Sequence, residues 1–181
     1  MPDINMFLYP VWPRVDKERW KKALSVLVSR QVVQATGEGE TEGEVWFLPG
    51  KRSSHALREA PEEAFEDCRV HSGNRYFIPD GDTSDLGASC PSCGKELEDA
   101  VAVEAIVDFN EADGVDDRQA CPHCENVIDV EKLRCRTKMA FAPAFISLVG
   151  AKSPRPNPDL LKALAEATGC EWDWLTEKVD L

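Results

Sequence analysis

The stretch "ASCPSCGKEL" (residues 88–97) contains two cysteines, Cys90 and Cys93, separated by a Pro-Ser dipeptide and followed directly by a glycine. A C-x-x-C pair alone is compatible with a metal site, a redox site or two unrelated thiols. A second pair, Cys121 and Cys124 in "CPHC", follows after 27 intervening residues. Two pairs favour metal binding, because a thioredoxin-like redox site needs one pair that follows a strand and opens a helix.

The four cysteines are predicted to close a tetrahedron around one Zn²⁺, with each pair occupying one edge. Four protein ligands leave no position for water or substrate, so the predicted zinc is structural and not catalytic. Proline fixes φ in each turn, and Gly94 can adopt the left-handed conformation. In the second pair Asn126 is predicted to take this role, since Glu125 and Asn126 stand where glycine is common. His123, inside that pair, is expected to be a solvated residue rather than a ligand.

The pattern Cys-Pro-x-Cys-Gly followed by Cys-Pro-x-Cys resembles the zinc-ribbon superfamily over about residues 88–136. This resemblance implies a ribbon fold and a bound metal. It implies no reaction, because zinc ribbons occur in transcription factors, ribosomal proteins and enzymes alike. A ribbon needs strands between its knuckles, and the alternating "VAVEAIVDF" (101–109) is predicted to be a half-buried strand, followed by an acidic turn at 110–119.

The net charge of −12 is concentrated around the cysteine pairs. Residues 80–136 hold 15 of the 33 acidic side chains but only 5 of the 21 basic ones. This charge disfavours nucleic acid as a partner, because phosphate binding depends on Lys and Arg. It fits either a surface that keeps the module soluble or one that docks onto a basic partner protein.

The chain length allows one substantial core with a small metal-bound module added to it. No apolar run is long enough to span a bilayer, and the first ten residues do not have the pattern of a signal peptide. Seven cysteines, four of them in pairs, fit reduced thiols in a cytoplasmic protein better than a disulfide scaffold. Cys68, Cys135 and Cys170 are expected to be buried thiols, and a second metal site from Cys68, His71 and Cys135 has no further pair to complete it.

Periodicity and turn residues predict the elements around the cysteine pairs. Strands are predicted at 3–11, 45–49, 75–79, 138–151 and 170–179, the last with Trp172 and Trp174 on one face. Helices are predicted from Asp16 to about Gln34 and from Asn157 to Gly169, where Asn157 caps and Gly169 terminates. A helical turn is expected near Ser53 or Ser54 and a helix from Pro61, with turns at 36–44 and 80–87.

Strand–helix–strand occurs twice, which matches an α+β fold of the ferredoxin-like (split βαβ) type, with two helices on one face of an antiparallel sheet. Three domains are predicted on this basis. Residues 1–79 form the first βαβ half with an irregular extension, 80–136 the inserted zinc ribbon, and 137–181 the second βαβ half.

No catalytic signature stands out. "GEGETEG" (37–43) lacks the lysine and Ser/Thr of a phosphate loop, and its glutamates would repel phosphate. Neither Ser53–His55 nor Cys68 with His71 forms a recognised nucleophile–base motif. The chain is therefore predicted to be a zinc-containing adaptor that binds, or neutralises, a basic partner protein through its acidic surface.

An alternative from a different class stays open. Catalytic or ligand-binding residues can come together in space without a sequence signature. This alternative is an enzyme or small-ligand-binding protein with a site at the junction of core and ribbon, lined by Trp46, His71, Trp172 or Trp174.

Overall fold

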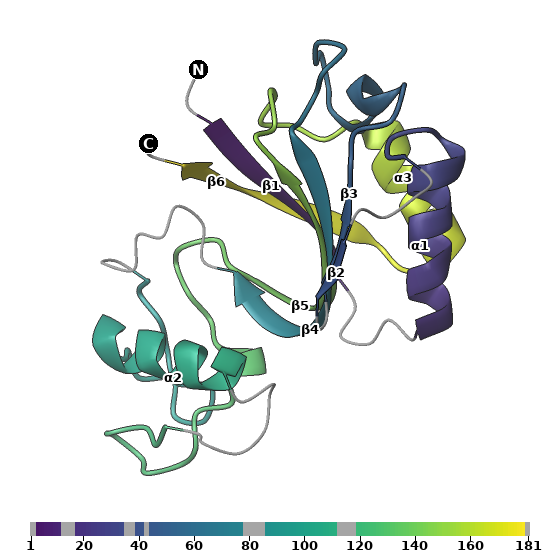
Figure 1. Ribbon diagram of the computed structural model, residues 1–181. Coiled ribbons are helices and arrows are strands. Elements are labelled where there is room, and N and C mark those ends of the chain that lie inside the picture. The colour runs from purple at the N-terminus through teal and green to yellow at the C-terminus, as the bar shows by residue number, and fades with distance from the viewer. Residues whose placement is uncertain are drawn as a thin grey trace. The chain divides into compact units, whose positions relative to one another are not determined.

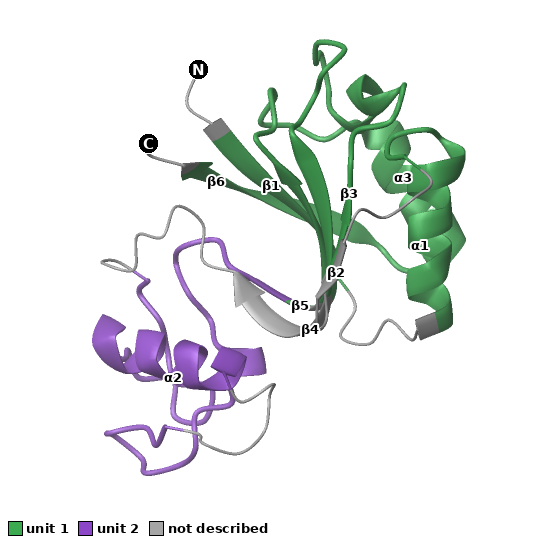
Figure 2. Ribbon diagram, viewed as in Figure 1, with its two compact units in different colours: residues 1–73, 142–181 green, residues 74–141 purple. Residues whose placement is uncertain are grey.

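The computed structural model describes residues 3–11, 17–34, 39–41, 44–77, 86–111 and 119–179. The chain divides into two compact units (Figure 2). Unit 1 comprises Met1–Gly73 and Ala142–Leu181, and unit 2 comprises Asn74–Phe141. No helix within the described ranges combines the length and apolar character that crossing a membrane requires.

Six strands of the described chain form one sheet with the order β2-β3-β4-β5-β1-β6 (Figure 1). The pairs β1–β5, β1–β6, β2–β3 and β3–β4 are antiparallel. The protein therefore has a mixed α/β fold with an antiparallel sheet. The strands are β1 (Asp3–Pro10), β2 (Gly39–Thr41), β3 (Glu44–Phe47), β4 (Asp67–Phe77), β5 (Ala140–Val149) and β6 (Trp172–Val179).

The strands predicted at 3–11, 45–49, 138–151 and 170–179 are confirmed, with ends shifted by a few residues. Residues 75–77 of the strand predicted at 75–79 form the end of a longer strand, because β4 begins at Asp67, and residues 78–79 lie outside the described residues. β4 lies between β3 and β5 and so forms part of the sheet itself.

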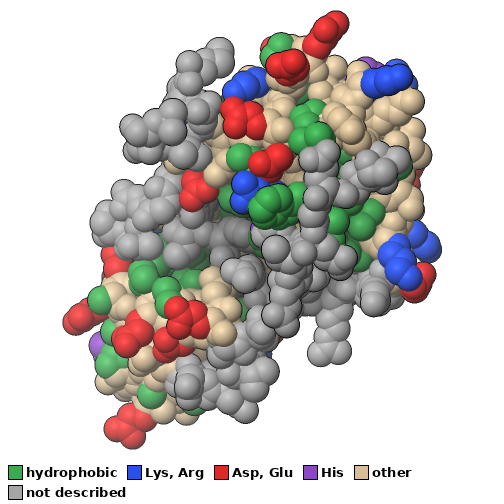
Figure 3. Space-filling view, in the orientation of Figure 1, with side chains coloured by type: hydrophobic (Ala, Val, Ile, Leu, Met, Phe, Trp, Pro, Cys, Tyr) green, Lys and Arg blue, Asp and Glu red, His purple; other side chains and the backbone are tan. Residues whose placement is uncertain are grey.

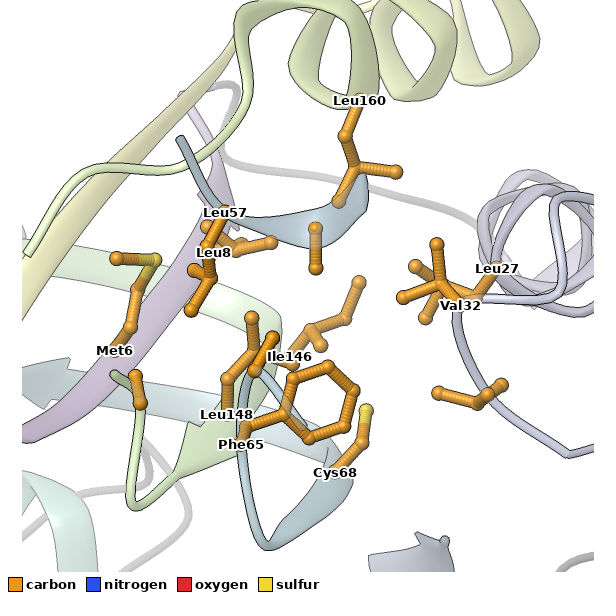
Figure 4. Close-up of a cluster of buried hydrophobic side chains, with 14 of the residues drawn as sticks. Met6, Leu8, Leu27, Val32, Leu57, Phe65, Cys68, Ile146, Leu148 and Leu160 are labelled. Carbon is orange, nitrogen blue, oxygen red and sulfur yellow. The ribbon is translucent and has the colours of Figure 1, made fainter. Parts of the chain in front are cut away.

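Two helices, α1 (Lys17–Ser29) and α3 (Pro158–Thr168), lie on the same side of the sheet and pack against each other (Figure 1). The strands bury alternate residues under them, as a two-residue period requires. Figure 4 shows the resulting cluster of apolar side chains in unit 1, most of them fully buried. Its fully buried members from the strands and helices include Met6, Leu8, Leu27, Ile146, Leu148, Leu160 and Leu164.

The helix predicted from Asn157 to Gly169 is confirmed with both of its end signals. The Asp159 N–H donates to Asn157 Oδ1 at 2.9 Å, which satisfies one of the free amides of the first turn. Gly169 adopts φ 70, and its N–H donates to the Ala165 carbonyl. These local interactions explain why sequence alone predicted this helix correctly.

The first helix is shorter than predicted, since α1 ends at Ser29 rather than near Gln34. Gln31 turns the chain with φ 58. The Val32 N–H then donates to the Leu27 carbonyl at 2.9 Å, which closes the end of the helix. This termination uses a left-handed residue that is not glycine, so no glycine marks it in the sequence.

The helix predicted from Pro61 is wrong, because residues 61–66, which lie directly before β4, form no helix. The Glu66 N–H donates to the Val149 carbonyl, and the Lys152 N–H donates to the Ala64 carbonyl, both at 2.8 Å. Backbone groups that a helix would use internally are therefore satisfied by the end of β5 and by the chain that follows it. Pro61 is a local signal for a helix start, but hydrogen bonds to residues distant in the sequence determined the structure of this segment.

The strand predicted at 101–109 is also wrong, because Asp99–Glu111 form an α-helix, α2. Ala102, Ala105 and Ile106 are at most 3% exposed and belong to the buried cluster of unit 2. Only a helical period places these three residues on one face. The alternating valines also fit a strand, which is why the sequence pattern was ambiguous.

Two short 3-10 helices complete the described elements, η1 (Ser53–Ala56) and η3 (Val130–Lys132). η1 confirms the helical turn predicted near Ser53. The turn predicted across 36–44 is wrong where the chain is described, because β2 and the start of β3 occupy that part. The Asp16 cap and most of the turns predicted at 80–87 and 110–119 lie outside the described residues.

Candidate metal centre

The first cysteine pair lies in a tight turn closed by two backbone hydrogen bonds. The Gly94 N–H donates to the Cys90 carbonyl at 2.8 Å, and the Cys90 N–H donates to the Lys95 carbonyl at 2.9 Å. Gly94 has φ 72, which confirms the left-handed glycine predicted after the pair. The turn is thus set by local sequence and presents both sulfurs to the same side.

The second pair repeats this geometry. The Glu125 N–H donates to the Cys121 carbonyl, and the Cys121 N–H donates to the Asn126 carbonyl, both at 2.9 Å. Glu125 has φ 60, so the prediction that Asn126 takes the left-handed conformation is wrong. The residue directly after the second cysteine must turn left-handed, as Gly94 does, and in this knuckle that residue is Glu125. A non-glycine residue accepts this at a cost of about 1–2 kcal/mol.

The two turns bring together the sulfur atoms of the four cysteines that are predicted to be metal ligands. All four Sγ atoms lie within 4.8 Å of one another. Cys90 Sγ is 3.9 Å from Cys124 Sγ, and Cys93 Sγ is 3.9 Å from Cys121 Sγ. A regular tetrahedron of sulfurs around zinc has edges of about 3.8 Å, whereas a disulfide would need about 2.05 Å. The group is therefore arranged to hold a metal ion.

The sulfur cluster lies at the edge of the core of unit 2. Cys90 and Cys121 are each 1% exposed and form part of its buried apolar cluster, whereas Cys93 is exposed and Cys124 half-buried. Other members of the cluster come from α2 and the segments flanking the knuckles, including Leu86, Leu97, Ile106, Ile128 and Val130. The site consequently connects the knuckles to the apolar core.

Electrostatics within the cluster favour partial ionisation. Burial raises the pKa of Cys90, but hydrogen bonds from the Cys93 and Ser92 N–H groups and from the Cys121 and Cys93 thiols together lower this pKa to about 7. For Cys124 the Asn126 N–H lowers the pKa, whereas burial and the neighbouring sulfurs raise it to about 11. Four thiolates in this space repel one another unless a cation neutralises them.

His123 belongs to the second knuckle but not to the ligand group. Its ring Nε2 lies 3.1 Å from the Glu96 carbonyl oxygen on the first knuckle, and its backbone N–H donates to Cys121 Sγ at 3.4 Å. The side chain is exposed. His123 therefore links the two knuckles and supports a ligand sulfur.

Asp99 is a structural residue that sequence reasoning did not identify. Its Oδ1 accepts hydrogen bonds from the Leu86 and Gly87 amides, at 3.1 and 3.2 Å. These bonds attach the start of α2 to the strand-like segment that leads into the first knuckle. An acidic residue at a helix start was the available signal, since such residues commonly accept backbone N–H groups.

The remaining cysteines lie apart from the cluster. Cys68 is fully buried in the core of unit 1, and burial together with Asp67 raises its pKa. Burial, and then Asp99, raises the pKa of Cys135. Cys170 Sγ lies 3.2 Å from Thr168 Oγ1. Within the described ranges, no second group of His, Cys, Asp or Glu has its ligand atoms gathered as the knuckle cysteines do.

The four aromatic residues that were predicted to line a ligand pocket make packing and stacking contacts within unit 1. Trp172 is 5% exposed, stacks on Trp20 with ring centroids 6.0 Å apart, and donates its Nε1–H to Thr168 Oγ1. Trp46 is 42% exposed and lies under the Arg69 guanidinium at 5.3 Å. His71 stacks on Phe145 at 4.1 Å, and Trp174 packs against the core of unit 1.

Unit 1 contains a cleft of about 1140 Å³ that none of these four aromatic residues lines. Val33 and Phe65 provide buried apolar walls, and exposed Lys51, Glu62 and Glu63 lie along it. Its lining includes neither histidine nor cysteine. The cleft can hold a ligand.

No family model matches this chain, and neither the curated proteins nor the solved structures include a match.

Proposed function

We propose that Cys90, Cys93, Cys121 and Cys124 hold one structural Zn²⁺ in unit 2, in a ribbon-like module with a helix between its knuckles. The observation that carries this proposal is the gathering of four sulfur atoms within 4.8 Å on two matching turns. Thiolates are soft ligands that suit zinc, and a tetrahedral four-sulfur set is typical of structural zinc sites.

The donor set also defines what the metal does. Four thiolates occupy all four coordination positions of a tetrahedral ion, so no position is left for a water molecule or a substrate. The ion would neutralise sulfurs that otherwise repel one another and would crosslink the two knuckles. Backbone N–H groups from residues 92, 93, 123 and 126 orient and stabilise the sulfurs.

Elemental analysis of freshly purified, reduced protein tests the metal assignment. About one zinc per chain is expected. Cys90→Ser and Cys121→Ser should each lose most of the zinc, whereas Cys170→Ser, a matched change in unit 1, should keep it. Absence of zinc from the wild-type protein, or its retention by both knuckle variants, would overturn the assignment.

The core of unit 1 is proposed to be a ferredoxin-like arrangement of β1, α1, β4, β5, α3 and β6. In a split βαβ fold the first and third core strands are central, the fourth lies beside the first and the second beside the third. The order β4-β5-β1-β6 supports this assignment when β4 is taken as the second core strand. β2 and β3 would then extend the sheet beyond β4.

For the whole protein, the proposed function is that of an adaptor that binds a basic partner protein through the acidic zinc module. The unequal charge of residues 80–136, with 15 acidic and 5 basic side chains, supports this function. Charge reversal at Asp113, Asp116 and Asp117, which lie outside the described residues, should abolish capture of the partner from lysate. Capture that survives this reversal unchanged would contradict the adaptor function.

Binding of a small ligand by unit 1 is a second candidate, favoured by the cleft of about 1140 Å³. The mixed lining suits a ligand that has an apolar body and polar ends. An NMR screen of polar metabolites should shift amide signals of Val33, Gly50 and Phe65. A screen without ligand-induced shifts at these residues would eliminate this candidate.

A further inference from the structure

The outward side of α2 is an exposed stripe of four residues, Ala100, Glu104, Val107 and Glu111, hereafter the α2 stripe. Their spacing of four, three and four residues places them on one face of the helix. Val107 is 43% exposed, which makes it one of the few large apolar side chains of the described chain that face solvent. Figure 3 shows hydrophobic and acidic side chains interspersed on the visible face of unit 2.

The charge of α2 has a single sign. The helix contains four acidic residues and no Lys, Arg or His. Two of the acids have structural partners: Asp99 binds backbone amides, and Asp108 accepts from Gln119 Nε2 at 3.2 Å. Glu104 and Glu111 form no ion pair among the described residues. The acids of the stripe are therefore available to a cation from outside.

The C-terminal end of α2 also favours a cation. The C-terminus of a helix carries partial negative charge, so cations are favourable there and anions unfavourable. Asp108 and Glu111 nevertheless occupy the last turn, which has no basic residue. Asp113, Asp116 and Asp117 follow directly in the sequence. A local conflict of this kind would be relieved by a cation docked at this end of α2.

We infer that the α2 stripe docks a basic, amphipathic segment of the partner protein. Lys or Arg side chains of that segment pair with Glu104 and Glu111, and an apolar side chain covers Val107. Nucleic acid is repelled by the same carboxylates. A second copy of this chain is also repelled, because each copy has a net charge of −12. The inference rests on the proposed adaptor function and specifies its contact surface.

The test uses the zinc-loaded full chain, labelled with ¹⁵N, and a synthetic helical peptide of about 18 residues that has a leucine face and a lysine face. Amide signals of Ala100–Glu111 are expected to shift on titration, and the Kd should rise with ionic strength. An oligolysine of equal length should bind more weakly, because it cannot cover Val107. A peptide with glutamate in place of lysine should not bind.

Two variants and a matched control separate the contribution of the ion pairs to the Kd from that of the apolar contact. E104Q/E111Q is expected to raise the Kd about threefold to tenfold, as loss of two exposed ion pairs predicts. V107S should raise it about twofold to threefold, through the lost apolar contact. V11S/E171Q changes an exposed valine and an exposed glutamate of unit 1 and should leave the Kd unchanged.

Each contrary outcome has a definite meaning. Shifts confined to other residues, equal binding of oligolysine, or equal weakening by V11S/E171Q would overturn the α2 docking surface. Self-association of the free chain that E104Q/E111Q abolishes would do the same, because the occupant would then be a second copy. Zinc content and folding of unit 2 are measured on the same samples, so failure of docking is distinguished from failure of the zinc assignment.

Discussion

The Sγ atom of Cys90 lies 3.9 Å from the Sγ atom of Cys124, although the residues are 34 positions apart in the chain. Cys93 and Cys121 make the equivalent contact. Each close sulfur pair therefore joins the first knuckle to the second, and α2 is part of the chain that connects them. A metal at this site closes a loop that includes most of the buried cluster of unit 2.

Removal of the metal is consequently expected to unfold unit 2 and to spare unit 1. Structural zinc contributes about 10–16 kcal/mol to small metal-bound modules, which exceeds what so small an apolar core supplies. In ¹⁵N spectra recorded with a chelator, the amides of Leu97, Ile106 and Ile128 should lose dispersion. The amides of Met6 and Leu148 should keep it, and added Zn²⁺ should restore the rest. A chelated protein with a fully dispersed unit 2 would contradict this expectation.

Asp99→Ala is expected to loosen unit 2, because the Leu86 and Gly87 amides both lose a charged acceptor. The loss should be roughly 2–4 kcal/mol, and Asp99→Asn should lose less because its carbonyl can still accept. Hydrogen exchange at the Leu97 and Ile106 amides measures the change. If Ala and Asn variants exchange like wild type, these hydrogen bonds do not stabilise the unit.

Alkaline conditions should destabilise unit 1 through Cys68, whose pKa is raised first by burial and then by Asp67. In the unfolded chain the Cys68 thiol titrates near 9.0. Below that pH the thiol is neutral in both states and the full stability of unit 1 is present. Above that pH the unfolded thiol ionises first, so the free energy of unfolding falls as pH rises. The expected slope is about 1.4 kcal/mol per pH unit above the unfolded pKa.

Urea denaturation between pH 9 and 10 tests this slope. Tryptophan fluorescence reports on unit 1, because all five tryptophans belong to it. Cys68→Ala should reduce the slope, whereas Cys170→Ala should keep it. Identical slopes for wild type and Cys68→Ala would rule out this origin of the pH dependence.

Gly50→Ala is expected to destabilise unit 1 strongly. A Cβ atom at this position would overlap the carbonyl of Gln31 and lie 2.8 Å from that of Val33, and both are backbone atoms. The cost should reach about 1–3 kcal/mol or more. At Gly169 an added Cβ atom would lie in open space. Gly169→Ala should therefore cost only the strain of a non-glycine residue at φ 70, about 1–2 kcal/mol. Thermal unfolding that ranks Gly169→Ala as the more damaging change would be inconsistent with this geometry.

Local signals explain which predictions of the fold were correct. α3 has its cap, its proline and its terminal glycine within one short stretch, and the predicted helix matches the observed one. The knuckle turns are similarly local, and Gly94 adopts its predicted conformation. The helix predicted from Pro61 was wrong because its backbone groups pair with Val149 and Lys152, which are distant in sequence.

The candidate metal ligands could be predicted from sequence, because the spacing of each cysteine pair and its turn residues specify a knuckle independently of the rest of the chain. So could the elements whose period or caps were unambiguous. The helix at residues 99–111 and the position of β4 between β3 and β5 could not be predicted from sequence. A short apolar run is compatible with both a helical and a strand period until a core buries one of its faces. Strand order likewise depends on pairings between residues far apart in the chain.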